Sequence, residues 1–500
     1  MNSLCEQLAD HQYAVALVLF VAGVLFFYVK QQSSGLHRPP RVPYWIPWLG
    51  SAIEMGRNPD AFFEKMTQRY GPVFKLKTVG KSMIYVTSPT LIQSIFRDSK
   101  HYDFHDIRMK MNEEVFLIPG AAMPPDLVKS WFLAHHRVLA PTSVPEMLKH
   151  YTHHAHHNVL ASIAEMSGRK TRMADFIVPT AYEATGKALF GELFPARQTL
   201  ANFQRFDRDF PLMAAGAPGF MLAKARRAWW NVISVLEDYV KEVELDEDVD
   251  VPPLAKLTLD VKQQGGWDAR TAAIVMAADM WASQTNGLWA AYWVMAFMLF
   301  EPNGLAPLVA EIDRARTSWV SQHPEKTLDA TTFHEFMADS TKAMPLLASA
   351  VQESLRISSS VMPIRRVVEP VELGGYSLQK DDVVIAVTRA VHLDDEIHPD
   401  AAAFRVDRYC EGKTFTKDGR SVPNHSMPFG GGVSICEGRH FVIGELKTLV
   451  ALILTYATVE LADRSGVRPE FDWSRLGSGI MQPRGDIDVI VRKREFSTLV

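Results

Sequence analysis

A single cysteine near the carboxyl end of the chain follows a glycine-rich segment. Residues 427–441 read MPFGGGVSICEGRHF, and Cys436 stands four residues after the last of three successive glycines. Glycines loosen the backbone, and the apolar pattern after the cysteine predicts a helix. The other cysteines are Cys5 and Cys410, and three in a long chain are too few for a disulfide framework. Cys436 is therefore a candidate for core packing, for a nucleophile or for a metal ligand.

Three charged residues could form a network in the same half of the chain. Glu353 and Arg356 are three positions apart in a predicted helix, so both project from one face. Arg408, in the segment FRVDRY, is available to the same carboxylate. A Glu-x-x-Arg pair alone is usually a solvated surface pair. Its combination with a later Phe-x-x-Gly-x-x-x-Cys-x-Gly pattern favours a structural role.

Phe429, Gly432, Cys436 and Gly438 match that pattern, and here the sequence resembles the cytochrome P450 family of heme-thiolate enzymes. The resemblance implies that Cys436 is the axial ligand of the iron in heme b and that Phe429 screens the sulfur from water. A thiolate donates electron density to iron and favours O–O cleavage. The glycines let backbone N–H groups approach the sulfur and tune its basicity.

The resemblance also assigns roles to the charged residues. It implies that Glu353, Arg356 and Arg408 form the buried triad that supports the proximal side of the heme. Arg365 matches the family's arginine that pairs with a heme propionate, since a guanidinium fork suits a carboxylate, and Arg366 is the neighbour that could replace it.

The residues expected to contact a second heme propionate depart from the family pattern. Most family members carry a basic residue two positions before the cysteine, where this chain has Ser434. Trp131 begins a Trp-x-x-x-Arg region in which the arginine position is His135. We therefore expect a contact from His135, with His136 and Arg137 as alternatives.

The oxygen-activating helix departs from the family pattern. An acid and an alcohol usually occupy the positions that are Thr285 and Asn286 here, in the stretch ASQTN. An amide can hold water through hydrogen bonds but does not titrate near neutral pH. We expect Asn286 to hold water near the iron and Thr285 to orient the same water.

This departure is itself informative, because residues 280–293 resemble the branch of sterol 7α-hydroxylases, sterol 12α-hydroxylases and prostacyclin synthase. The sequence GIMQP at residues 479–483, here named the C-terminal turn, resembles the substrate turn of that branch. The leading hypothesis is a monooxygenase that hydroxylates a sterol, triterpenoid or related hydrophobic lipid with O2 and electrons from NADPH–cytochrome P450 reductase. The alternatives are an isomerase or dehydratase that rearranges a lipid peroxide without a reductase, and a non-catalytic heme-binding membrane protein.

The elements that would position these residues are chiefly helical. Residues 71–89 alternate around Gly80-Lys81 as a β-hairpin does, and strand patterns return at 367–387 and 487–491. The uncharged residues 280–300 could suggest a membrane span, but the polar SQTNG in their centre favours a helix buried in the core. The expected fold class is mainly α with a minor β-sheet (α+β), the fold of cytochrome P450.

The amino terminus predicts attachment to a membrane. Residues 13–29 are almost wholly apolar, at the short limit of a spanning helix, and the basic residues that follow favour a cytosolic body. Prolines in residues 38–50 predict a stiff connector. We expect a membrane anchor at 1–30, a connector at 31–50 and a catalytic domain at 51–500, single-pass in the endoplasmic reticulum membrane. Residues 210–222 offer a second apolar surface for the bilayer.

Composition and two further motifs bear on three other functions: nucleic-acid binding, phosphate binding and zinc binding. A formal charge of -4 over 500 residues excludes the basic footprint of a nucleic-acid binder. Gly412-Lys413-Thr414 lacks the upstream glycine of a phosphate loop. Four histidines fall on one predicted helical face: His150, His153, His154 and His157. A zinc site there is an alternative, but solvated or partly buried histidines are favoured because nothing supplies a second structural element.

Overall fold

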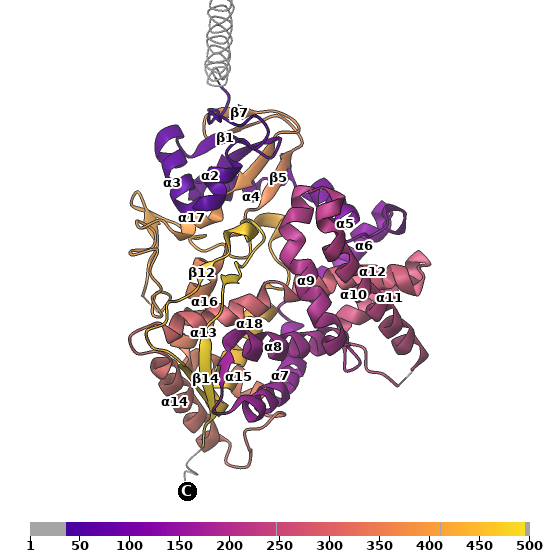
Figure 1. The fold of residues 1–500 in the computed structure, drawn as a ribbon, viewed down its shortest axis with the longest axis vertical. Coiled ribbons are helices and arrows are strands. Elements are labelled where there is room, and N and C mark those ends of the chain that lie inside the picture. Colours follow the sequence, from indigo (N-terminus) through magenta and orange to yellow (C-terminus); the bar gives the residue numbers. More distant parts are fainter. Residues whose placement is uncertain (1–36, 247, 411, 496–500) are drawn as a thin grey trace, which may run out of the picture. The chain divides into compact units, whose positions relative to one another are not determined.

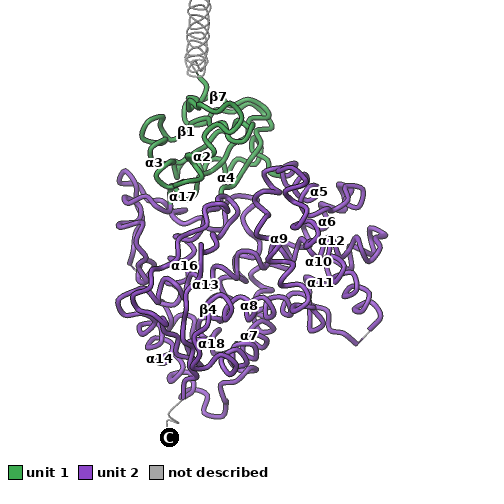
Figure 2. Tube along the Cα trace, viewed as in Figure 1, with its two compact units in different colours: residues 1–104, 362–391 green, residues 105–361, 392–500 purple. Residues whose placement is uncertain are grey.

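A computed structural model of the chain describes residues 37–246, 248–410 and 412–495. The predicted anchor at 1–30 lies outside this range. Within the described residues, no helix has both the length and the apolar character that crossing a bilayer requires. The chain divides into two compact units (Figure 2): the first extends to Phe104 and also includes Met362–Val391, and the second consists of His105–Val361 and the chain from His392 onward.

The first unit combines a sheet with short helices. Its elements are α2 (Ala52–Arg57), α3 (Pro59–Tyr70), β1 (Val73–Thr78), β2 (Lys81–Val86), α4 (Pro89–Arg97), β3 (Tyr102–Asp103), β5 (Ile364–Val367), β6 (Val371–Leu373), β7 (Tyr376–Leu378) and β8 (Val383–Ala386), with α17 (Thr388–His392) at its end. The strands of the five-stranded sheet lie in the order β1-β2-β8-β5-β3.

The predicted hairpin is confirmed in this unit. β1 and β2 pair antiparallel from Val73↔Val86 to Thr78↔Lys81, and Gly80 turns the chain with a φ of +79°. β8 then joins β2 in parallel. Residues 37–50 form no helix, as their prolines predict, and one of them, Arg41, makes an isolated bridge to Lys75 of β1.

The second unit contains most of the helices (Figure 1). They are α5 (His105–Glu114), α6 (Pro125–Val138), α7 (Val144–Met166), α8 (Met173–Phe190), α9 (Ala196–Ala215), α10 (Gly219–Leu245), α11 (Pro253–Gly265), α12 (Ala269–Gln284), α13 (Gly287–Leu299), α14 (Ala306–Gln322), α15 (Phe333–Ser340), α16 (Pro345–Ser358) and α18 (Arg439–Tyr456). Short 3₁₀ turns are η1 (Gly120–Ala122), η2 (Thr341–Ala343), η3 (Gly432–Ser434) and η4 (Trp473–Arg475).

The strands of this unit are few and short. They are β4 (Lys170–Arg172), β9 (Thr416–Lys417), β10 (Arg420–Ser421), β11 (Ala457–Leu461), β12 (Glu470–Phe471), β13 (Pro483–Arg484) and β14 (Asp488–Lys493). β14 lies between β11 and β4 in a three-stranded sheet. The prediction of a mainly helical fold with a minor sheet is confirmed.

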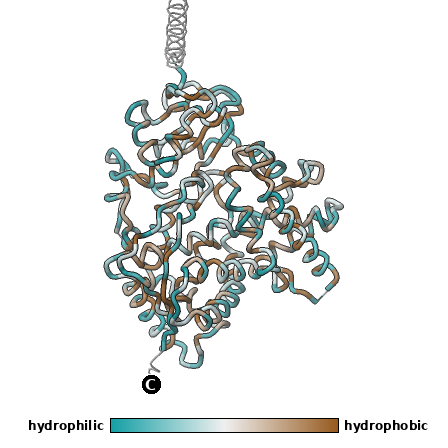
Figure 3. Tube along the Cα trace, viewed as in Figure 1, coloured by the Kyte–Doolittle hydropathy of each residue, from teal (hydrophilic) through white to brown (hydrophobic). Residues whose placement is uncertain are grey.

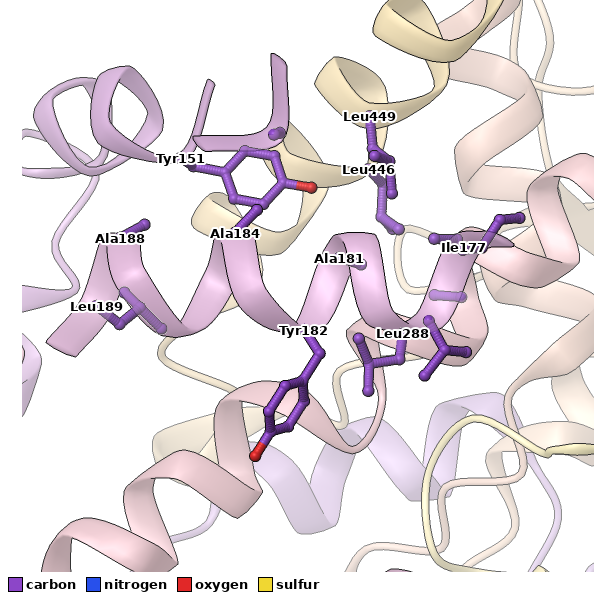
Figure 4. Packing of buried hydrophobic residues seen from close by; sticks show 14 of the residues in the cluster. Tyr151, Ile177, Ala181, Tyr182, Ala184, Ala188, Leu189, Leu288, Leu446 and Leu449 are labelled. Carbon is purple, nitrogen blue, oxygen red and sulfur yellow. The ribbon is translucent and has the colours of Figure 1, made fainter. Parts of the chain in front are cut away.

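The core of the second unit lies where α7, α8 and α18 pack together (Figure 4). Small residues of α8, including Ala181 and Ala184, are fully buried and let the neighbouring helices approach closely. Tyr151 of α7 and Leu446 of α18 fill the space beside them. Along the outer helices, hydrophilic and hydrophobic residues alternate, as expected for helices with one buried face (Figure 3).

Most of residues 280–300 are buried in the core, as predicted, but they belong to two helices. α12 ends at Gln284 and α13 begins at Gly287, so the break falls at Thr285 and Asn286. Nearly every residue of α13 is buried. The polar group of residues in the middle of this apolar segment therefore marks the end of one helix and the start of the next.

One carboxyl group in the core has few partners. Glu445 of α18 is buried and accepts a hydrogen bond from the Thr185 hydroxyl. Its second oxygen, Oε2, has no partner among the described residues. Burial raises the pKa of Glu445 to about 8, although the Thr185 hydrogen bond opposes the rise. This side chain is therefore protonated in the folded protein at neutral pH.

Glu445→Gln tests this protonation. Between pH 4.5 and about 8 the unfolded chain ionises the group while the folded chain keeps its proton, so the free energy of unfolding falls as pH rises. The pKa difference between the folded and the unfolded chain changes the free energy of unfolding by a few kcal/mol, at about 1.4 kcal/mol per pKa unit. Thermal unfolding from pH 5 to 9 should show the variant gaining stability relative to wild type as pH rises. Parallel curves would contradict the assignment, and the exposed Glu242→Gln serves as the control.

Candidate active site

The segment before Cys436 folds into a tight loop. Gly430 and Gly432 both have a φ of +71°, a conformation that side chains with a Cβ rarely adopt. The Cys436 N–H donates to the Phe429 carbonyl over 3.1 Å and closes the loop. Phe429 itself is half-buried against the core. The glycines thus allow the chain to reverse and present the cysteine immediately before α18.

The Cys436 thiol is surrounded by protein and yet accessible. Its side chain is exposed, although desolvation raises the pKa of the thiol and backbone hydrogen bonds from Gly438 and Arg439 oppose that rise. The thiol is therefore partly desolvated and still reachable. A Cβ added at Gly438 would have no atom within 4 Å. The loop therefore has room for a flat group beside a sulfur that accepts N–H hydrogen bonds, as heme ligation requires.

Glu353, Arg356 and Arg408 come together in the interior. The Arg356 Nε and Nη2 donate to the two carboxylate oxygens of Glu353, each over 2.7 Å. The Arg408 Nε donates to Glu353 Oε1 over 2.8 Å. Glu353 and Arg356 are 0% exposed and Arg408 is 5% exposed, so this is a buried network and not a surface pair.

The network extends toward the cysteine loop through backbone groups. Arg356 Nη1 donates to the carbonyls of His392 and Ala401. The imidazole Nε2 of His392 in turn accepts from the N–H of Met427 over 2.7 Å, and Met427 begins the loop. The buried carboxylate thus holds two guanidinium groups that fix the segment leading to Cys436.

At the break between α12 and α13, the polar side chains form hydrogen bonds with other parts of the protein. The Thr285 hydroxyl donates to the carboxylate of Asp207 over 2.6 Å. The Asn286 Oδ1 accepts from the N–H of Ile480, in the C-terminal turn, over 2.8 Å. Because a backbone N–H only donates, this contact fixes the Asn286 amide with its NH2 group directed elsewhere. On the preceding turn of α12, Ala282 is exposed between the half-buried Trp281 and Ser283.

His135 is the inward-facing member of its basic group. It is buried, whereas His136 and Arg137 are exposed. Its Nδ1 donates to the Trp131 carbonyl over 3.0 Å, and its Nε2 lies 3.3 Å from the Asp279 carboxylate. Burial alone would lower the pKa of His135, but the charge and hydrogen bond of Asp279 outweigh it and raise the pKa. Asp279 thus favours the protonated form of this buried imidazole.

Arg365 lies in the first unit, on β5. Its guanidinium stacks over the rings of Phe96 and Phe104, 5.8 and 5.5 Å from their centroids. It is 5% exposed, whereas Arg366 pairs with Asp381 over 3.6 Å nearer the surface. Of the two arginines, Arg365 is the buried one. Ser434, before the cysteine, is half-buried.

Several histidines of helix α7 contact carboxylate or hydroxyl groups. His150 lies 3.4 Å from Glu146, and His154 lies 3.3 Å from Glu192. His156, also on α7, contacts the Tyr456 hydroxyl over 3.1 Å. Within the described ranges, no group of three potential ligands is suitably placed for a metal ion.

Sequence reasoning missed Asp207 of α9. This residue is buried and receives hydrogen bonds from Thr285, Trp281 and Gln482, and an ion pair from Arg475. The only local signal is an aspartate on the apolar face of an amphipathic helix. Its partners come from distant segments of the chain, so no sequence pattern could predict that they meet at Asp207.

The fold and the cysteine loop agree with a comparison against known families. The model of the family described as Cytochrome P450 matches residues 40–491. The chain therefore belongs to the cytochrome P450 family of monooxygenases, which bind heme through a cysteine thiolate, take electrons from a redox partner and act on hydrophobic substrates.

Individual relatives lie in the predicted branch, and that resemblance is confirmed. Cholesterol 7-alpha-monooxygenase of Cricetulus griseus is 27% identical over 499 residues, covering 95% of this chain and 97% of the relative. The 7-alpha-hydroxycholest-4-en-3-one 12-alpha-hydroxylase of Oryctolagus cuniculus is 25% identical, covering 95% and 97%. Prostacyclin synthase of Homo sapiens is 25% identical, covering 90% and 93%.

Glu353→Ala tests the buried network. The substitution leaves the Arg356 and Arg408 guanidinium groups buried without their carboxylate, which should cost roughly 3 to 5 kcal/mol. We expect a large fall in heme-loaded protein and in thermal stability, measured by heme absorbance per chain and by thermal unfolding. Glu54→Ala, which breaks the exposed pair with Lys65, should change both by little. Equal behaviour of the two variants would contradict a structural role for Glu353.

Proposed function

We propose that this protein is a membrane-anchored monooxygenase that hydroxylates a sterol, triterpenoid or related hydrophobic lipid. It uses O2 and electrons from NADPH, delivered by NADPH–cytochrome P450 reductase. The observation that supports the proposal most directly is the Cys436 thiol, which is accessible and accepts backbone N–H hydrogen bonds just before α18.

Heme bound through the Cys436 sulfur supplies the activation of dioxygen. The residues of the chain would bind and orient that group. The N–H groups of Gly438 and Arg439 would temper the basicity of the thiolate, and Phe429 would screen it from water. Gly432 would allow the turn before the sulfur. The Glu353 network would keep the loop in place.

Two basic side chains would receive the heme propionates. Arg365 and His135 are each buried, and each has a neighbour that fixes its orientation. A guanidinium donates to a carboxylate through two parallel N–H groups, whereas both ring nitrogens of His135 already have partners, the Trp131 carbonyl and the Asp279 carboxylate. We therefore assign the stronger propionate contact to Arg365.

Asn286 and Thr285 would act on the distal side. The Asn286 Oδ1 is held by the Ile480 N–H, so its NH2 group is oriented to donate to water or to a substrate oxygen. The Thr285 hydroxyl donates to Asp207 and can only accept from a water. The pair would order water without supplying a proton itself.

The sterol class is supported by the relatives and by the C-terminal turn. Two relatives are named for hydroxylation of cholesterol or of a related cholestenone. In this chain the turn is fixed by its backbone: the Trp293 indole N–H donates to the Met481 carbonyl over 2.6 Å, and the Ser360 N–H donates to the Gly479 carbonyl over 2.7 Å. A rigid turn of this kind suits a large, inflexible substrate.

Peroxide rearrangement is the second candidate. Prostacyclin synthase is a relative of nearly equal identity, and an amide at position 286 is suited to hold a peroxide oxygen as well as a water. Such an isomerase would need neither reductase nor dioxygen. We favour hydroxylation because two of the three relatives described above are hydroxylases.

Membrane attachment would come from more than one part of the chain. We assign the anchor to residues 1–30, the connector to 31–50 and the catalytic domain to 51–500, facing the cytosol at the endoplasmic reticulum. Trp45 and Trp48 of the connector are 72% and 61% exposed, as in residues of a membrane interface. Phe220 and Met221, at the start of α10, are 83% and 50% exposed and support a second apolar contact.

The two candidate functions differ in their source of oxygen and electrons. With cholesterol as the probe, we expect turnover that requires both NADPH and reductase, and a hydroxylated product that contains one atom from isotopically labelled dioxygen. Mass spectrometry of the product measures the label. Conversion of a lipid endoperoxide without NADPH, with no label in the product, would overturn the proposal in favour of an isomerase.

A further inference from the structure

The helix α9 contains a proline that leaves one of its carbonyl groups without a helical donor. In an α-helix, the carbonyl of residue 207 accepts from the N–H of residue 211. Residue 211 is Pro211, which has no N–H and whose ring crowds that same carbonyl. The carbonyl of Asp207 therefore needs a hydrogen-bond donor from elsewhere, because a buried carbonyl without one is costly.

Arg475 supplies the missing donor. Its Nη1 donates to the Asp207 carbonyl, and its Nη2 donates to the carboxylate Oδ1 over 3.0 Å. Arg475 and Asp207 are each 2% exposed. One guanidinium fork thus satisfies the backbone defect that Pro211 creates and pairs with the buried charge of the same residue, a double contact that a lysine ammonium cannot reproduce.

The Asp207 carboxylate also connects α9 to the distal side of the site. The Thr285 hydroxyl and the Trp281 indole, both near the end of α12, donate to Oδ1 over 2.6 and 3.0 Å. The Gln482 side chain, in the C-terminal turn, donates to Oδ2 over 2.8 Å. Asn286 then bonds the same turn through Ile480. One buried residue of α9 therefore sets the spacing between the end of α12 and the C-terminal turn.

We propose that Asp207 and Arg475 are positioning residues for selectivity: they offset the helix defect at Pro211 and thereby fix the C-terminal turn against the end of α12. The pair does not touch the substrate. It acts through the turn and through Thr285, so it determines which carbon of a bound lipid faces the heme. This role rests on the proposed hydroxylase function, since the turn contacts the substrate only in that account.

The position of the Asp207–Arg475 pair indicates a role in selectivity in addition to a role in stability. The pair is the point at which three separate chain segments meet: α9, the end of α12, which carries the distal residue Thr285, and the segment that leads into the C-terminal turn. A small displacement of the C-terminal turn would leave the apolar core intact. It would nevertheless reorient a rigid substrate that contacts the turn. One methylene group more or less in a hydrophobic pocket changes discrimination by about ten- to 200-fold. We expect a loosened turn to change selectivity by an amount at the low end of that range, about tenfold.

The test is a double-mutant cycle in the full-length, heme-loaded protein. Arg475→Lys keeps the charge but not the fork, so the Asp207 carbonyl loses its donor. Pro211→Ala restores a helical N–H for that carbonyl. We expect Arg475→Lys to lower the thermal midpoint and to change the ratio of hydroxylated cholesterol isomers by about tenfold. In the Pro211→Ala background, both effects should be smaller, which defines a coupling between the two sites.

A second helix proline provides the control. Pro179 lies inside α8 and is exposed, so Pro179→Ala should not diminish either effect of Arg475→Lys. Additive effects of Arg475→Lys and Pro211→Ala would overturn the proposal. So would an unchanged isomer ratio in the loaded Arg475→Lys enzyme, since that variant would then affect folding alone.

If Arg475→Lys yields no loaded enzyme, Gln482→Ala replaces it, because it releases the C-terminal turn from Asp207 without leaving a buried charge. The isomer ratio should still change, at normal heme content, and an unchanged ratio would overturn the selectivity role. Absence of any hydroxylated cholesterol from the wild-type enzyme is a different failure. It would refute the proposed function together with the selectivity role, while the cycle measured by thermal unfolding would still decide whether Arg475 compensates Pro211.

Discussion

The structure of the site depends on one buried carboxylate. Glu353 carries a charge in a region with no access to water, and that charge is tolerable only because two guanidinium groups donate to it directly. The remaining N–H groups of each arginine donate to backbone carbonyls of residues 392–403. A segment without regular secondary structure is thereby given a fixed course, and it leads through His392 to the loop that presents Cys436.

The cysteine itself shows how the protein prepares for its cofactor. Burial raises the pKa of the Cys436 thiol, while the N–H groups of Gly438 and Arg439 oppose that rise. The free group is therefore a thiol, and ligation of iron must displace its proton. The same N–H groups would then stabilise the thiolate, so the loop provides hydrogen bonds that the metal-bound form uses best.

Sequence patterns predicted the features that depend on neighbouring residues. The hairpin at Gly80 and the glycine loop before Cys436 are each defined within about twenty positions. The uncharged residues 280–300 predicted a single helix but form two. The partners of polar residues in the core were not predictable, because Asp207 meets Arg475 across 268 positions and Asn286 meets Ile480 across 194. His135 was selected from a motif, but its pairing with Asp279 required the packed helices. Local patterns thus identified elements and candidate ligands, whereas the contacts that orient them arise only on folding.

The account rests on ligation of heme by Cys436, and the spectrum of the reduced, carbon monoxide-bound protein tests this most directly. The protein offers its own comparison, because Cys410 is also a free cysteine but lies outside the loop. Wild type and Cys410→Ala should both show the far-shifted Soret band of thiolate ligation, and Cys436→Ala should lose it. Retention of that band in Cys436→Ala would contradict the account.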